Sequence, residues 1–100
     1  MTQVTSYILK VTDETAATLR GLHPEIKSII KAAFKTIIKE PHTGKILKDN
    51  LKGLRSYRVK RYRIIYRVLA SEKQLEIIAI GPRKNIYEET FKLIRKRQSR

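Results

Sequence analysis

The chain has 100 residues and carries 23 lysines and arginines against 9 aspartates and glutamates, a formal net charge of +14. This length suits one domain with a single core, which we place over residues 1–100. The absence of cysteine excludes disulfides, thiolate catalysis and cysteine-based zinc sites. No stretch approaches the roughly 18 apolar residues that a membrane helix needs, so we expect a cytoplasmic protein without a membrane anchor.

The positive charge is concentrated in two segments. Residues 44–70 hold nine basic residues and one acid, a net +8, and residues 83–100 hold seven basic residues and two acids, a net +5. Residues 1–43 add +2 and residues 71–82 subtract 1. Such a field attracts polyanions, so we expect a nucleic acid or an acidic protein as partner. The alternative, a solvated basic surface without a partner, would spread its charge more evenly.

The chain opens with a predicted strand and a short helix. Residues 3–11 are rich in β-branched and aromatic types, which favour a strand. Thr12 or Asp13 can then cap a helix over residues 12–22, which Gly21 ends. A strand and a helix so close together indicate a mixed fold from the first residues onward.

A longer amphipathic helix is predicted for residues 24–40. Pro24 suits a helix start because its missing N–H is not needed there, and Pro41 ends the helix because the residue before a proline avoids the α region. His23 is expected to cap this helix, and His42 to lie in a loop. The apolar residues recur at i, i+3, i+4 and i+7 and predict one buried face: Ile26, Ile29, Ile30, Ala33, Phe34, Ile37 and Ile38.

After a linking stretch at residues 42–53 the apolar pattern changes to a period of two. This pattern predicts three strands, over residues 54–60, 61–69 and 74–81, with a very short turn between the first two. In those two strands tyrosine, isoleucine and valine alternate with arginine and lysine. One face of the pair is therefore expected to be apolar and the other densely cationic.

A last helix is predicted over residues 85–97, with Ile86, Phe91 and Ile94 toward the core. The complete order is β-α-α-β-β-β-α, which predicts an α+β fold. We expect an antiparallel sheet packed against the two N-terminal helices. The other face of this sheet is expected to be partly open and to carry the arginines.

The sequence contains no Ser/His/acid set, paired carboxylates, metal-ligand spacing or glycine-rich phosphate loop. The unusual cluster is basic: Arg58, Lys60, Arg61 and Arg63, followed by Arg83 and then Tyr87. Arginine matches phosphate oxygens, a lysine among arginines has a lowered pKa and can accept a proton, and tyrosine can stack on a base. Such a set can cleave RNA through the ribose 2′-OH. Taken alone, these residues favour a phosphate-binding surface without chemistry over an enzyme.

The run LKGLRSYRVKRYRIIYRV at residues 51–68, followed by IGPRKNIYEE at residues 80–89, resembles the RelE/ParE superfamily of toxins of toxin–antitoxin modules. The resemblance covers the whole chain in element order and is specific over residues 51–87. It implies a RelE-like microbial RNase fold. It is strongest for the RelE branch, which implies ribosome-dependent cleavage of mRNA codons in the A site, by 2′-OH attack that leaves a 2′,3′-cyclic phosphate, without a metal or cofactor. The ParE branch implies the alternative, a DNA gyrase inhibitor without nuclease activity.

The resemblance also implies roles for single residues. Lys60 would be the general base, and Arg83 would protonate or neutralise the leaving oxygen. Arg58 and Arg63 would hold the phosphate, and Tyr87 would stack on or orient the nucleotide. Further RNA contacts are expected from eight other basic residues: Lys45, Lys48, Lys52, Arg55, Arg61, Lys84, Lys92 and Arg95.

The expected partners follow from the resemblance and from the charge. An acidic, partly disordered antitoxin similar to RelB would wrap the cationic face, neutralise its repulsion and block the site. The mRNA and the 30S A site of the ribosome would be the other partners. A non-toxic RNA-binding module is the third reading, and it would leave growth unaffected when the protein is expressed.

Overall fold

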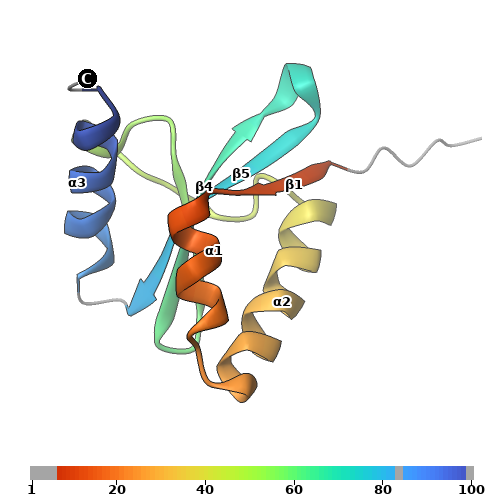
Figure 1. Cartoon of the computed structure of the whole chain (residues 1–100). Helices are drawn as coiled ribbons and strands as arrows, with labels where there is room; N and C mark the ends of the chain where they lie inside the picture. Colours follow the sequence, from red (N-terminus) through yellow and green to blue (C-terminus); the bar gives the residue numbers. More distant parts are fainter. Residues whose placement is uncertain (1–6, 83–84, 99–100) are drawn as a thin grey trace, which may run out of the picture.

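The structure, a computed structural model, describes residues 7–82 and 85–98 (Figure 1). The first part of the predicted strand at residues 3–11 therefore lies outside the described residues. Two 3₁₀ turns, η1 (Asp49–Leu51) and η2 (Ala70–Glu72), join some of the regular elements. The regular elements are β1 (Ile8–Val11), α1 (Asp13–Arg20), α2 (Pro24–Lys39), β2 (Lys45–Ile46), β3 (Arg55–Val59), β4 (Tyr62–Leu69), β5 (Gln74–Pro82) and α3 (Ile86–Gln98).

The five strands form one sheet in the order β1-β5-β4-β3-β2. The α+β class and the order of the main elements are confirmed. The sheet is mixed, however: β1 pairs with β5 in parallel, whereas the other three pairings are antiparallel. The parallel pair arises because α1 and α2 carry the chain away from β1 before β5 returns beside it. The short strand β2 lies in the stretch predicted as a link, since two residues are too few to give a period-two signal.

The helix boundaries follow the capping residues seen in the sequence. Thr12 caps α1, and its hydroxyl accepts a hydrogen bond from the Thr15 backbone N–H at 3.2 Å. His23 caps α2 by accepting from the Glu25 backbone N–H at its Nδ1, 3.2 Å away. Gly21 ends α1, as predicted. The two helices lie on the same side of the sheet, and α3 lies on the other (Figure 1).

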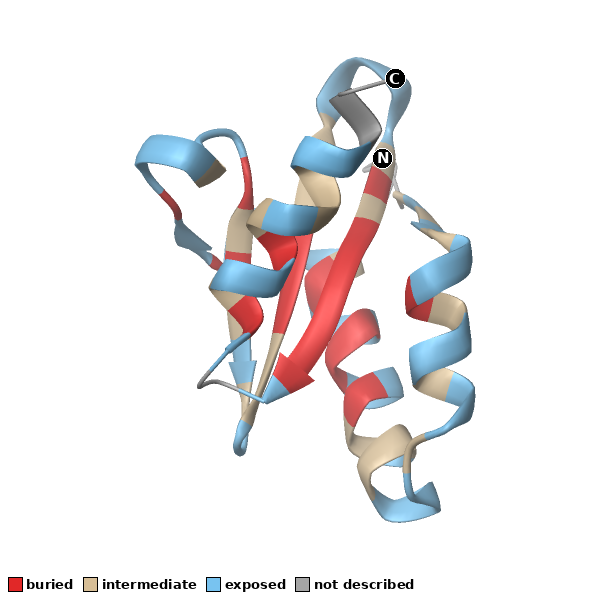
Figure 2. Cartoon of the chain, turned by 60° about the vertical axis from the view of Figure 1, so that its left-hand side comes forward, coloured by how far each residue is buried: buried red, intermediate tan, exposed pale blue. Residues whose placement is uncertain are grey.

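Each face of the sheet therefore has its own apolar cluster (Figure 2). On the α1 and α2 side, the predicted face of α2 packs on the apolar face of the hairpin, as expected from the alternation. On the α3 side, the buried cluster is smaller, so α3 covers part of the face that was expected to be open. The first cluster contains Ile30, Ala33, Phe34, Ile37, Ile64, Tyr66, Leu75, Ile77 and Ile80, and the second Leu47, Leu54, Ile65, Ile78, Ala79 and Ile86.

A bulge in β5 supplies part of the second cluster. Ile65 pairs with Ala79, but the next residue of β4 pairs with Ile77, so Ile78 has no partner on β4. The extra residue turns Ile78 and Ala79 toward the same side, where both are buried under α3. The Thr15 hydroxyl donates to the Ile78 carbonyl at 2.8 Å, so this carbonyl of the bulge has a hydrogen-bond partner.

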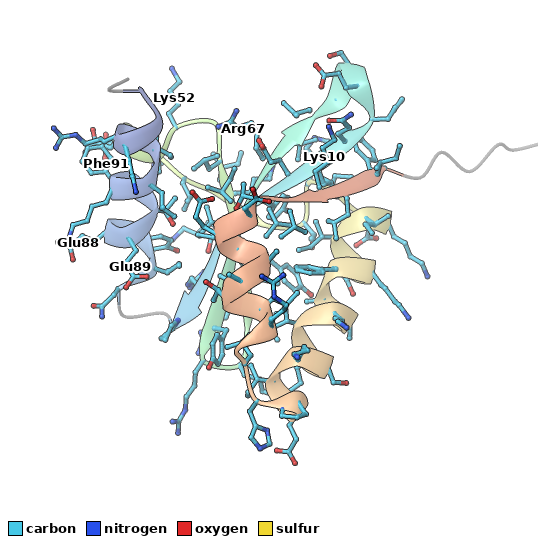
Figure 3. All side chains as sticks on the ribbon, in the orientation of Figure 1. Lys10, Lys52, Arg67, Glu88, Glu89 and Phe91 are labelled. Atoms are coloured by element: carbon cyan, nitrogen blue, oxygen red, sulfur yellow. The ribbon has the colours of Figure 1, made fainter. Side chains whose placement is uncertain are left out.

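The prediction that Phe91 faces the core is wrong. Thr90 is fully buried instead and donates its hydroxyl to the Ile86 carbonyl at 2.7 Å, whereas Phe91 is half-buried and outside both clusters (Figure 3). The Arg95 guanidinium lies 5.7 Å from the centroid of the Phe91 ring. The predictions for Ile86 and Ile94 are confirmed, since Ile86 is buried in the second cluster and Ile94 packs against it, as does Tyr87.

Candidate active site

The β3–β4 hairpin brings two of the predicted arginines face to face. Arg58 and Arg63 are directly opposite each other in the antiparallel register, and on the other side of β4 Arg63 pairs with Gly81. Arg58 is exposed, and its Nε donates to the Lys60 carbonyl at 3.4 Å. Side chains opposite each other across a strand pair lie on one face of the sheet. Two guanidinium groups therefore share the face on which α3 packs.

The turn between these strands places Lys60 at the tip of the hairpin. Lys60 and Arg61 are both exposed. Lys60 has a backbone φ of 56°, in the left-handed region that a lysine adopts only at a cost. A positive φ at the first of two turn residues keeps the hairpin tight and matches the twist of the strands. The amine of Lys60 is therefore presented to solvent just beyond Arg58.

Ser56 joins Arg63 to Tyr87, and the sequence reasoning missed it. Its hydroxyl oxygen accepts hydrogen bonds from Arg63 Nη1 at 3.0 Å and from the Tyr87 hydroxyl at 3.2 Å. Ser56 is only 2% exposed. Its position two residues before Arg58, on the same face of β3, was the available signal. A buried serine on a cationic face must find polar partners, because an unpaired hydroxyl there would be costly.

The Arg63 guanidinium also lies 5.8 Å from the centroid of the Tyr87 ring, a cation–π contact. Its Nε is buried and has no hydrogen-bond partner among the described residues. An unsatisfied charged donor is unfavourable, so an anionic acceptor that reached it would be bound favourably. Arg63, Tyr87 and Ser56 together form what we call the Ser56 cluster.

Gly81 allows α3 to approach the sheet closely enough to form this cluster. A Cβ at this position would lie 2.9 Å from Cδ1 of Ile86, closer than packed atoms tolerate. Ile86 is the first residue of α3 and is buried. The missing side chain thus leaves room for the Ile86 side chain at the start of the helix that carries Tyr87.

A surface hollow of about 340 Å³ lies on the other side of Tyr87. It is bounded by Tyr87, by β2 and by the loop that includes η1, and Lys45 and Lys48 are part of its wall. Both lysines are exposed, as is Lys52, which points outward from the loop beside α3 (Figure 3). A polyanion lying over Tyr87 would therefore meet arginines on one side and lysines on the other.

Other predicted residues lie further out or elsewhere. Lys92 and Arg95 are exposed on α3. Arg83 and Lys84 lie outside the described residues. Arg55 belongs to a different group: its Nη1 donates to the carbonyls of His42 and Gly44, at 3.1 and 2.8 Å.

That group fastens the turn after α2 to the sheet. The Tyr66 hydroxyl donates to the Pro41 carbonyl at 2.7 Å and accepts from the Gly44 N–H at 2.9 Å. Burial raises the pKa of Tyr66 above its usual 10.0, although the hydrogen bond from Gly44 and the charge of Arg55 partly oppose the shift. Arg55 thus helps to hold the turn after α2 against the sheet, on the face opposite the Ser56 cluster.

Two further properties of the described residues concern metal binding and membrane insertion. Within residues 7–82 and 85–98, no group of three or more histidines, aspartates or glutamates is arranged to hold a metal ion. Among the described helices, none is long and apolar enough to cross a membrane. The described site consists of guanidinium, ammonium, hydroxyl and aromatic groups, which suit the binding of a phosphate and of a stacked base.

Comparisons with known proteins identify relatives of this fold. The profile of the family described as "ParE-like toxin of type II bacterial toxin-antitoxin system" matches residues 9–91. No curated protein sequence matches the chain significantly. Among solved structures, the toxin–antitoxin complex RelBE2 of Mycobacterium tuberculosis contains a chain that is 28% identical, with a TM-score of 0.72 over 81% of this chain and 95% of that one.

Two more distant structures have the same fold. A mutant of the E. coli toxin RelE in the free state is 16% identical, with a TM-score of 0.75 over 92% of this chain and 97% of that one. The archaeal RelE–RelB complex from Pyrococcus horikoshii contains a chain that is 23% identical, with a TM-score of 0.65 over 78% of this chain and 96% of that one. The likeness thus extends over nearly the full length of each of these relatives.

Proposed function

The chain belongs to the ParE-like toxins of type II bacterial toxin–antitoxin systems, and we propose that it acts as a RelE-type endoribonuclease that cleaves mRNA in the ribosomal A site. The observation that carries the proposal is the facing pair Arg58 and Arg63 beside Tyr87. Two guanidinium groups on one face match the oxygens of a phosphodiester, and an adjacent tyrosine offers a ring for a base.

The proposed reaction begins at the ribose 2′-OH. Lys60 acts as the general base and takes the proton, the 2′-oxygen attacks phosphorus, and the bond from phosphorus to the 5′-oxygen breaks. The products are a 2′,3′-cyclic phosphate and a 5′-OH, and Arg83 neutralises or protonates the departing oxygen. Arg58 and Arg63 stabilise the additional negative charge that develops on the phosphate oxygens.

Ser56 and Tyr87 have supporting parts in this proposal. Tyr87 stacks on or orients the nucleotide next to the cleaved bond. Ser56 is a positioning residue, because its hydroxyl fixes both the Arg63 guanidinium and the Tyr87 hydroxyl before substrate arrives. Lys45 and Lys48, in the wall of the hollow beside Tyr87, would contact the flanking phosphates, and so would Lys52, which is exposed in the same loop.

An antitoxin partner is part of the proposal. Several similar structures are complexes of a toxin with its antitoxin, including RelBE2 of Mycobacterium tuberculosis and YoeB–YefM of Staphylococcus aureus. A net charge of +14 makes an acidic partner favourable, since it would relieve repulsion within the toxin. We propose that both proteins act in the cytoplasm, where the ribosome and mRNA are found.

Primer extension on a defined message in a translating extract tests the proposal. The wild-type toxin should produce breaks at codon-spaced positions, and Lys60→Ala and Arg83→Ala should lose them. Lys10→Ala is the control, because Lys10 is exposed on β1, on the far side of the molecule from α3 (Figure 3). The same RNA without ribosomes should be cut poorly, because the A site holds the codon in the reactive conformation. Unchanged cleavage by both variants would refute the assigned roles.

Gyrase inhibition is the second candidate function, favoured by the ParE-like description of the family. A toxin of this kind would block supercoiling of relaxed plasmid by purified gyrase and would leave the message intact. The two assays therefore give opposite outcomes. Codon-spaced breaks with normal supercoiling support the nuclease, and blocked supercoiling without breaks supports the gyrase inhibitor.

A further inference from the structure

A row of lysines follows the exposed side of α2, remote from the Ser56 cluster. Lys27, Lys31, Lys35 and Lys39 recur every four residues, so they lie about 6 Å apart along the helix axis. The buried residues of α2, among them Ile30 and Phe34, pack on the sheet face opposite α3 (Figure 2). The lysine row, as we call these four residues, is thus a second cationic surface on the other side of the sheet.

The four ammonium groups are not neutralised within the described protein. None of them forms an ion pair with a described carboxylate; Lys27 Nζ instead donates to the Arg20 carbonyl at 3.4 Å. The acids of this helix stand only at its ends, with Glu25 in the first turn and Glu40 at the C-cap. Like charges four residues apart destabilise a helix, so the row opposes the stability of α2 and contributes no contact to the core.

A shallow groove of about 470 Å³ runs along this row and is lined by Pro24, Lys27, Ser28, Lys31, Ala32 and Lys35. The floor offers small residues and lysine stems but no large apolar or aromatic side chain. Protein interfaces rely on buried aromatic or large apolar anchors, which are absent from this lining. A sugar–phosphate backbone needs only spaced cations and room to lie between them.

We propose that the lysine row of α2 is a docking surface for the phosphate backbone of structured RNA. It would hold the protein on folded RNA from the side opposite the Ser56 cluster, without reading sequence. This role goes beyond the proposed cleavage and does not require it, because docking involves neither Lys60 nor the arginines of the site. An acidic protein is the competing occupant, and the lack of apolar anchors disfavours it.

The test compares two variants that lose the same charge. Lys31→Gln/Lys35→Gln removes the middle of the row, and Lys10→Gln/Lys73→Asn removes two exposed lysines near the β1 end of the sheet. Asparagine is chosen at position 73 because the φ of Lys73, 55°, is in the left-handed region, which asparagine tolerates better than most residues. Binding to a short RNA duplex of arbitrary sequence is measured as a function of salt, and circular dichroism checks that each variant is folded.

With about 0.9 counterions released per phosphate contact, the value for duplex DNA, the row variant should reduce the slope of log K against log salt by about 1.8. The control variant should leave the slope unchanged. Equal changes in both variants, or no change in either, would overturn the proposal. A larger loss of binding to poly-glutamate than to the duplex would overturn it in favour of an acidic protein. Cleavage is not measured, so failure here is separate from failure of the proposed nuclease.

Discussion

Replacing Ser56 with alanine tests whether the cluster between β3 and α3 is held together as the structure indicates. The substitution removes one hydrogen bond from Arg63 and one from Tyr87, and leaves both donors without this partner. A bond to a charged group contributes about 1.5–3 kcal/mol and a neutral one about 0.5–1.5 kcal/mol. Arg63 is partly exposed, so water can replace part of its bond. We therefore expect a loss of about 2 kcal/mol in the free energy of unfolding.

For a domain of this size, that loss corresponds to a fall in melting temperature of about 8–16 °C. The assays are chemical denaturation and cleavage in the translating extract, both at a temperature where the variant remains folded. Ser71→Ala is the matched control, since Ser71 is exposed in η2. In a double-mutant cycle, Ser56→Ala and Tyr87→Phe should be coupled by about 0.5–1.5 kcal/mol. Zero coupling in stability would refute the shared hydrogen bond, and full cleavage by folded Ser56→Ala would refute the positioning role.

Four further substitutions have definite expectations. Gly81→Ala should destabilise by about 1 kcal/mol, because the buried Cδ1 methyl group of Ile86 must move away from the new methyl group, whereas Gly21→Ala, with its nearest contact at 3.6 Å, should be neutral or stabilising in denaturation curves. Tyr66→Phe should lose about 1–3 kcal/mol at neutral pH. Because the pKa of Tyr66 is raised in the folded protein, the tyrosine loses its proton in the unfolded chain first. The free energy of unfolding should therefore fall as pH rises above 10.0. Denaturation followed against pH should show no such fall from residue 66 in the phenylalanine variant. Lys60→Gly should raise the free energy of unfolding by about 1 kcal/mol, because glycine adopts a φ of 56° without strain. The same variant should no longer produce codon-spaced breaks in the message. A variant that is more stable and fully active would exclude Lys60 as the base.

The sequence predicted most of the fold because its signals are local. Capping by Thr12 and His23 and the alternation along β3 and β4 each depend on residues close together in the chain, and all were confirmed. The parallel pairing of β1 could not be seen in this way, because it depends on where two distant segments meet. On α3, Ile86 and Ile94 were predicted correctly, whereas Phe91 was not. Phe91 gave the stronger apolar signal, but Thr90 is buried instead and satisfies its own hydroxyl within the helix.

The site was predictable in composition but not in its connections. Alternation placed Arg58 and Arg63 on one face, and the structure brings Tyr87 to Arg63, as the resemblance implied. Ser56 was missed because a single serine in a strand carries no pattern, and its importance arises only when α3 is positioned above it. Arg55 was predicted among the RNA contacts because charge counting cannot show that its guanidinium donates to the carbonyls of His42 and Gly44.

The two cationic surfaces have a consequence for how an antitoxin would act. The Ser56 cluster and the lysine row lie on opposite faces of the sheet, so a partner that covers only the α3 side leaves the row on α2 exposed. Such a complex would be inactive in cleavage and still bind structured RNA, because the two functions use different charges. An antitoxin long enough to reach both faces would abolish docking as well. Salt-dependent duplex binding by the purified complex, compared with that of the free toxin, therefore reports how far the antitoxin extends around the fold.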